Sequence, residues 1–365
     1  MRYVKYSVVW FLLIAAVFIG HSQVLFSQNS TKSLKELQEQ ADRIHKKIFS
    51  IDTHNDTALS INNPKEDQGV TTGQVSFPLM KEGGLDAALF AIYIGQKERD
   101  KKSLDSAVAY TKENLLRFRS YVEDYRGASL AYGSEDLLRN KRNGVTSVML
   151  AIENGYAIGV DISNLEMFRD IGVRAITICH NDNNDICDAS RDKNGPEHNG
   201  LSDFGREVIK EMNRLGIIVD VSHASVKTVF DVLEVSEAPI MASHSGVYAI
   251  KNHPRNLRDK EIIAIAEAGG LIQVATGRFF LSHLPKDSVT VKHLVDHIDY
   301  VKNLVGIDYV GLGTDFDGGG GVVGLENASK VKNITIELLR RGYTEEEIEK
   351  FWGANFIRFL KSQNL

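Results

Sequence analysis

Short apolar runs rich in β-branched residues recur along the chain, each bounded by polar residues or glycine. Runs of this length and composition predict strands buried on both faces. Eight such runs are present, and we expect one strand in each. They are residues 48–56, 86–92, 147–152, 174–179, 217–221, 240–242, 271–274 and 309–312.

Between these runs lie segments whose apolar residues recur every three or four positions, as in helices packed on a sheet. Strands that alternate with helices imply parallel strands joined by crossovers, and eight of them suggest a closed barrel. The pattern therefore predicts an α/β fold, a (β/α)8 TIM-type barrel in one domain. The expected helices are residues 33–47, 106–121, 203–215, 226–233, 259–268 and 291–305.

Side chains that can bind a metal ion follow six of the eight expected strands, and only the second and seventh lack one. The functional side chains of such barrels lie at the C-terminal strand ends. His54 and Asp56 end the first run. Because residues i and i+2 of an extended chain point the same way, these two can share one divalent cation. The later strand ends carry Glu153, His180, the pair Asp220 and His223, His244, and Asp315.

Each of these residues also has a purely structural explanation. A single histidine beside a strand is more often a hydrogen-bonded structural residue than a ligand. Glu153 or Asp220 could cap a helix or pair with an arginine. The recurrence at six strand ends favours a metal site over six separate explanations. We expect structural roles for the histidines on helices and loops, which are His45, His198, His253, His283, His293 and His297.

The glycine-rich segment from Asp315 to Gly320, with Glu326 beyond it, differs from a calcium-binding loop at one ligand position, where Gly319 stands. It follows an expected strand and not a helix, which argues against calcium binding. Glycines let a substrate approach the backbone closely. We therefore expect this segment to border a substrate site.

The 365 residues carry a formal net charge of -5, and the positive charges are scattered along the sequence. This distribution argues against nucleic acid or an anionic membrane surface as a partner, so we expect a small molecule. The two cysteines, Cys179 and Cys187, are too few for a disulfide framework, and the sequence does not define whether they pair. The fold must therefore rest on its hydrophobic core.

The first 28 residues have the order of a secretory signal peptide, with Arg2 and Lys5, an uncharged apolar stretch from Ser7 to Gly20, and a polar flank. The stretch is shorter than the ~20 residues of a membrane span, and an uncleaved anchor is the competing interpretation. We expect residues 29–365 to form the exported barrel, periplasmic or extracellular, without stable membrane insertion. The cleavage site is not defined by the sequence.

Six motifs follow one another in a fixed order: IDTHND at 51–56, GLSDFG at 200–205, NRLG at 213–216, DVSH at 220–223, SHS at 243–245 and GTDFDG at 313–318. Together they resemble the membrane dipeptidase (renal dipeptidase) family of zinc peptidases, which have amidohydrolase-like barrels. The resemblance extends from about Ile48 to Leu360, which is nearly all of the expected mature chain.

The resemblance implies a site with two zinc ions. His54 and Asp56 match ligands of the first ion. His223 and His244 match ligands of the second, and Glu153 matches the carboxylate that bridges both. Imidazole and carboxylate groups suit Zn2+, and a bridging carboxylate holds two cations close together.

The resemblance also implies two catalytic residues, His180 and Asp315, that contact the substrate. His180 would contact the oxyanion of the tetrahedral intermediate, and Asp315 would pass a proton from the attacking water to the departing amine. Arg255 matches an arginine that binds the free carboxylate of the substrate, for which a planar fork is well suited. Without the resemblance, Arg255 would be taken for a surface residue on a loop.

The leading hypothesis is a secreted zinc dipeptidase, and the resemblance leaves open whether its substrates include dipeptides with a D-residue at the C-terminal position. The alternative is a related amidohydrolase acting on N-acyl amino acids or lactams, since the same metals would serve and only the pocket would differ. A binding protein on an inactive barrel is a third hypothesis, which the complete set of ligands opposes. Similar peptidases are often dimers, so a homodimer is an expectation by analogy.

Overall fold

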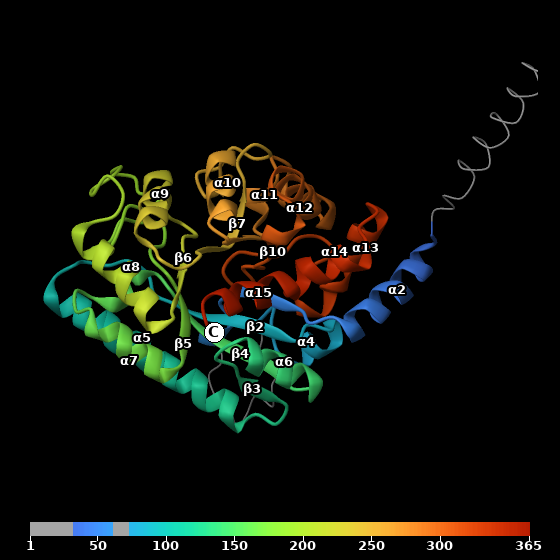
Figure 1. The fold of residues 1–365 in the computed structure, drawn as a ribbon, viewed down its shortest axis with the longest axis horizontal. Coiled ribbons are helices and arrows are strands. Elements are labelled where there is room, and N and C mark those ends of the chain that lie inside the picture. The colour runs from blue at the N-terminus through green and yellow to red at the C-terminus, as the bar shows by residue number, and fades with distance from the viewer. Residues whose placement is uncertain (1–31, 61–72) are drawn as a thin grey trace, which may run out of the picture. The chain divides into compact units, whose positions relative to one another are not determined.

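Eight parallel strands lie side by side in the order β1-β2-β4-β5-β6-β7-β9-β10, and helices surround them (Figure 1). The two edges meet just past β1 and β10, where the Asp56 amide donates to the Phe316 carbonyl over 2.9 Å and the Asp315 amide donates to the His54 carbonyl over 3.0 Å. The barrel is thus nearly closed, and the predicted (β/α)8 architecture is confirmed. The strands are β1 (Ile51–Asn55), β2 (Ala87–Tyr93), β4 (Thr146–Glu153), β5 (Val173–Thr177), β6 (Ile218–Asp220), β7 (Met241–Val247), β9 (Leu271–Val274) and β10 (Val310–Leu312).

The computed structural model describes residues 32–60 and 73–365. Residues 41–365, which contain every strand, form one compact unit. The expected signal peptide, residues 1–28, lies outside the described residues. Among the helices that are described, none combines the length and the apolar character needed to cross a bilayer.

All six predicted helices are present. α8 (Asp203–Leu215) and α12 (Val291–Val305) have the predicted bounds, whereas α5 (Lys101–Asp124) is longer than predicted. It begins earlier because the Asp100 carboxylate accepts hydrogen bonds from the amides of the first turn. The remaining three are α2 (Leu34–Lys47), α9 (Val226–Val235) and α10 (Asp259–Glu267).

Nine further short α-helices and strands among the described residues were not predicted. The two strands contain three and two residues, too few to show a two-residue period. All seven of these α-helices have at most nine residues, so their apolar positions recur too few times to mark a helical face. These elements are β3 (Ala128–Leu130), β8 (Asn256–Leu257), α4 (Phe77–Gly83), α6 (Ser134–Arg142), α7 (Ser163–Ile171), α11 (Arg278–Leu281), α13 (Lys332–Arg340), α14 (Glu345–Glu349) and α15 (Asn355–Ser362).

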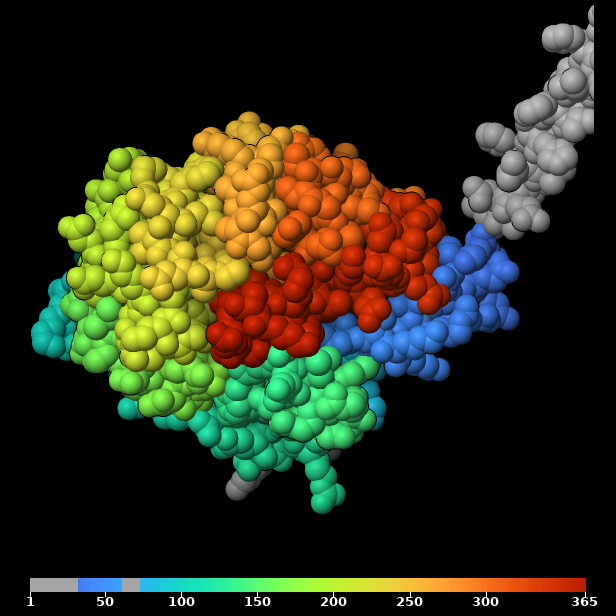
Figure 2. All heavy atoms as spheres, viewed as in Figure 1, coloured from blue at the N-terminus to red at the C-terminus, as the bar shows by residue number. Residues whose placement is uncertain are grey.

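Alternate side chains of each strand face opposite sides of the barrel wall, as the pleat requires. Along β2, Leu89 belongs to the inner apolar cluster, and its neighbour Phe90 belongs to the outer cluster beneath the helices. Phe356 and Phe359 of α15 also pack in the inner cluster. The C-terminal segment then meets the segment around α6 on the surface (Figure 2), where the Ser134 hydroxyl donates to a C-terminal oxygen over 2.8 Å.

The strand register aligns polar residues at the C-terminal ends of adjacent strands. Tyr93 of β2 lies opposite Glu153 of β4, which in turn lies opposite Thr177 of β5. Thr177 is paired with Asp220 of β6. The register therefore places a row of polar side chains at one end of the barrel, where catalytic residues of this fold class lie.

Candidate metal centre

The other four predicted metal ligands converge on Glu153, the last residue of β4. Its Oε1 atom lies 3.2 Å from His223 Nε2 and 3.5 Å from His244 Nε2. Its Oε2 atom lies 3.7 Å from His54 Nε2, which is itself 3.6 Å from Asp56 Oδ2. One carboxylate thus faces imidazoles from the β1, β6 and β7 segments with both of its oxygens.

Several buried polar atoms at this centre have no hydrogen-bond partner within the described part of the chain, among them His54 Nε2 and both carboxylate oxygens of Asp56. Buried polar atoms normally have a partner, and ligation of a cation would satisfy these. The residues therefore fit divalent cations. Three groups of residues offer ligand atoms within 4.8 Å of one another: His54 with Asp56 and Glu153, Glu153 with His180 and His223, and His54 with His244 and Asp315.

A chain of hydrogen bonds behind His244 fixes which of its nitrogens faces the centre. The Ser243 hydroxyl donates to Asp220 Oδ2 over 2.5 Å, so its oxygen accepts the Nδ1–H of His244 at 2.8 Å. The lone pair of His244 therefore lies on Nε2, the atom that faces His223 Nε2 at 3.0 Å. Asp220 thus orients the predicted ligand His244 through its hydrogen bond with Ser243. Among the described residues, it neither caps a helix nor pairs with an arginine.

At His54, burial lowers the pKa, but the nearby carboxylates of Glu153 and Asp56 outweigh it and raise the pKa well above 6.5. At four other groups of the centre, burial sets the direction of the pKa shift. It raises the pKa of Glu153 to about 7, and the nearby charge of Asp56 adds to the effect. The pKa of Asp315 is raised well above its usual range by the same two causes. Burial lowers the pKa of His223 and of His244 well below 6.5, so both are neutral at pH 7, as ligands must be. A bound cation would instead favour ionised carboxylates.

His180 lies at the edge of the centre, with Nε2 3.8 Å from Glu153 Oε1. Its ring packs against that of His223, with centroids 4.2 Å apart, and against the edge of Tyr93 at 4.7 Å. Burial, together with the smaller effect of the Arg255 charge, lowers the pKa of His180 to about 4. Tyr93 was missed in the sequence because it ends the second strand, where a search for ligands finds no histidine or carboxylate.

Asp315 lies in a left-handed turn after β10, with a φ of 58°. The turn is held by the hydrogen bond to the His54 carbonyl and by the Gly320 amide, which donates to the Asp315 carbonyl over 2.6 Å. A Cβ atom on Gly318 would lie 2.1 Å from Asp56 Oδ2 and 2.5 Å from Asp315 Oδ1, so a side chain there would displace both carboxylates. The glycine-rich segment thus borders the centre, as predicted.

Arg255 is buried, with 4% of its surface exposed, on the loop that follows β7. One of its terminal nitrogens donates to the His244 carbonyl oxygen over 3.0 Å, while Nε has no partner among the residues described. The guanidinium lies 5.4 Å from the ring centroid of Phe280. Since guanidinium has five N–H donors, most of them remain available to a bound anion.

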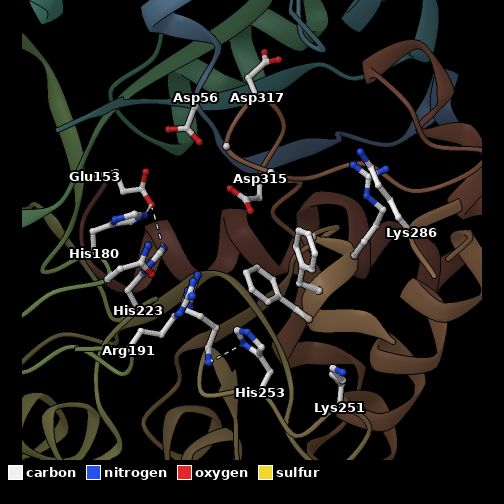
Figure 3. A pocket seen from close by; sticks show the side chains of 18 of the residues that line it. Asp56, Glu153, His180, Arg191, His223, Lys251, His253, Lys286, Asp315 and Asp317 are labelled. Atoms are coloured by element: carbon white, nitrogen blue, oxygen red, sulfur yellow. Dashed lines mark hydrogen bonds and ion pairs between the residues drawn. The ribbon is translucent and has the colours of Figure 1, made fainter. Parts of the chain in front are cut away.

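A cavity of about 1090 Å³ opens onto the centre (Figure 3), and its lining includes Asp56, Glu153, His180, His223, Arg255 and Asp315. His253 and His283 also line it, although we expected structural roles for them. The expectation of a structural role agrees with the contacts of His45 and His297, whose Nε2 atoms lie 2.8 Å from Thr335 Oγ1 and 3.1 Å from the Leu281 carbonyl oxygen. The cations that line the outer cavity were missed because they lie on loops or begin helices of three or four residues, which are too short to show a periodic pattern. They are Arg191, Lys251, Arg278 and Lys286.

A cluster of histidines and carboxylates at the C-terminal end of a (β/α)8 barrel is typical of metal-dependent hydrolases. More specifically, the chain belongs to the membrane dipeptidase family, peptidase family M19, whose sequence model matches residues 38–365. It is therefore a metallopeptidase of the dipeptidase type.

Individual relatives agree with this assignment. Dipeptidase tcpJ of Claviceps purpurea is 33% identical over 295 residues, which cover 79% of this chain and 69% of the relative. An uncharacterized dipeptidase of Schizosaccharomyces pombe is 32% identical over 92% of this chain and 86% of its own length. The crystal structure of the probable dipeptidase PvdM from Pseudomonas aeruginosa, 28% identical, superposes with a TM-score of 0.83 and covers 90% of this chain and 98% of its own.

Proposed function

We propose that this chain is an exported dipeptidase with two zinc ions bridged by Glu153. His54 and Asp56 would hold one ion, and His223 and His244 the other. The observation that carries the proposal is the placement of both Glu153 oxygens between imidazoles from the β1, β6 and β7 segments. Imidazole and carboxylate donors in this proportion suit Zn2+.

The roles proposed for the catalytic residues follow from their positions beside this centre. Zinc would lower the pKa of a water molecule and polarise the scissile carbonyl. Asp315 would carry the proton to the departing amine, a role that suits a buried carboxyl group with a raised pKa. His180, next to Glu153 at the cavity wall, would donate a hydrogen bond to the developing oxyanion.

Arg255 would bind the C-terminal carboxylate of the substrate. Its free donors and its burial support this role, because a charge-assisted pair is stronger where water is excluded. A carboxylate held by Arg255 places the scissile bond toward Glu153 and the metal ligands. We include substrates with a D-residue at the C-terminal position, since a guanidinium recognises the carboxylate and not the configuration of the adjacent carbon.

The experiment that tests the proposal is turnover by the zinc-loaded protein on a panel of dipeptides with an L- or D-residue at the C-terminal position. N-acetyl amino acids and a lactam serve as the comparison. Hydrolysis of the free dipeptides supports the proposal. Hydrolysis of only the acylated compounds or the lactam would make the related amidohydrolase the correct assignment. Export rests on the pattern of residues 1–28 and is tested by the cellular fraction in which the full chain accumulates.

A further inference from the structure

The cavity has two electrostatic sides. Four carboxylates lie toward the metal ligands: Asp56, Glu153, Asp315 and Asp317. Five cationic side chains line the rest of the cavity, from the segments that follow β5, β7 and β9: Arg191, Lys251, Arg255, Arg278 and Lys286. Figure 3 shows Asp56, Glu153, Asp315 and Asp317 at one end of the view and Arg191 and Lys251 at the other. Two divalent cations would carry as much positive charge as the four carboxylates carry negative, so the five cations would be left in excess.

None of these five cations forms an ion pair with a carboxylate in the ranges 32–60 and 73–365. Lys251 instead contacts an imidazole, His283 Nδ1, at 2.6 Å. Arg278 is half-buried, and its Nε atom has no partner among the residues described. Arginine and lysine side chains placed together without counterions repel one another, and a bound anion relieves the repulsion.

Two of the cations lie close to the carboxylate position proposed for the substrate. The pKa of His253 is lowered to about 4, mainly by burial. The nearby charges of Arg191, Arg255 and Lys251 also contribute to this shift. Arg255 and His253 are in direct contact, since the Arg255 amide donates to His253 Nδ1 over 3.2 Å. Arg191 and Lys251 therefore flank the place where the C-terminal residue of a dipeptide would lie.

We propose that Arg191 and Lys251 form a subsite for an acidic side chain, so that the preferred substrates are dipeptides ending in an aspartyl or glutamyl residue. The inference rests on the proposed function, because Arg255 must hold the main-chain carboxylate. The side chain of the same residue begins one bond away from that carboxylate. It therefore enters the space that Arg191 and Lys251 border, and its second carboxylate neutralises part of the excess charge.

The test compares Ala-Glu with Ala-Gln, which have nearly the same shape and differ in side-chain charge. For the zinc-loaded wild-type protein at low salt, we expect kcat/KM for Ala-Glu to exceed that for Ala-Gln by about tenfold, the equivalent of one partly desolvated charge pair. The preference should fall at ~1 M salt, where the Debye length is only ~3 Å. The preference for Ala-Glu should appear mainly as a lower KM, since the subsite is distant from the reacting atoms.

The double variant Arg191→Gln, Lys251→Gln should bring the ratio of the two kcat/KM values close to one. Lys112→Gln, an exposed substitution on α5 away from the cavity, is the matched control and should keep the wild-type ratio. A wild-type ratio near one, or equal losses on both substrates in the double variant, overturns the subsite. Either result leaves dipeptide hydrolysis intact, whereas a protein that hydrolyses no dipeptide overturns the proposed function and the subsite together.

Discussion

The Nε2 atoms of His223 and His244 lie 3.0 Å apart, although the first residue follows β6 and the second lies within β7. Burial lowers the pKa of both imidazoles, so they are neutral at pH 7. Zinc–nitrogen distances of about 2.0–2.1 Å place two ligands of a tetrahedral ion roughly 3.3 Å apart. The pair therefore has close to the spacing of two ligands on one ion.

Ser243 holds one member of this pair in the required tautomer, so its removal should weaken metal binding. We expect Ser243→Ala to lower zinc affinity by about 10- to 100-fold, as for other partners behind a ligating histidine. Competition with a chromogenic chelator measures the affinity. Ser245→Ala is the matched control, because this buried hydroxyl of the same strand has no hydrogen-bond partner in the described chain. Equal affinities for the two variants would remove Ser243 from the metal site.

Arg255 is proposed to bind substrate without affecting the metals. Arg255→Lys replaces a planar fork by a point charge, so kcat/KM for free dipeptides should fall by about tenfold or more while zinc content stays unchanged. Dipeptides with an amidated C-terminus should show a much smaller loss. A loss of the same size on both substrate types would indicate a structural arginine, held by its contact with the His244 carbonyl.

Asp315 borders the metal ligands, and its ligand atom lies within reach of those of His54 and His244. Asp315 could therefore act as a metal ligand or as a proton carrier. As a proton carrier, it should be dispensable for metal binding. We expect Asp315→Asn to lower kcat by about 10²-fold or more with the full zinc content retained. Loss of zinc in this variant would make Asp315 a ligand, and an unchanged kcat would remove it from the mechanism.

The raised pKa of Glu153 predicts a pH-dependent stability in the metal-free protein. The pKa is 4.5 for the ordinary group and about 7 in the fold, so between these values the native state holds a proton that the unfolded state releases. The contribution of Glu153 to the free energy of unfolding is therefore complete below pH 4.5 and is lost as the pH rises through 7.

Glu153→Gln removes this titration. Relative to wild type, the metal-free variant should gain stability between pH 5 and 7.5, by about 3 kcal/mol at most. Urea unfolding of both proteins after dialysis against a chelator measures the difference. The two proteins would show parallel stability profiles over this range if burial did not raise the pKa of Glu153.

The periodic parts of the fold were predictable from the sequence. Runs of apolar residues predicted each of the eight barrel strands. The apolar faces of α8 and α12 predicted where these helices end. The convergence of His54, Glu153 and His223 was also predictable, because parallel strands bring their C-terminal ends to one edge. The spacing of His54 and Asp56 placed both on one side of the chain, as their 3.6 Å separation shows.

What escaped prediction depends on contacts between distant segments. Asp220 and Ser243 support His244 through hydrogen bonds that link two strands, which no local pattern encodes. Tyr93 reaches the centre through the register of β2 with β4. Arg191 and Lys251 lie on loops of different length, and only the folded chain brings them to one cavity.

The zinc content of the purified protein and of Glu153→Gln, measured by mass spectrometry alongside dipeptide turnover, tests the central claim most directly. We predict two zinc ions per wild-type chain, and loss of both metal and activity in the variant while its circular dichroism stays native. Glu123→Gln, at an exposed position of α5, should retain two ions and full turnover. Two zinc ions and normal turnover in Glu153→Gln would contradict the bridged binuclear site.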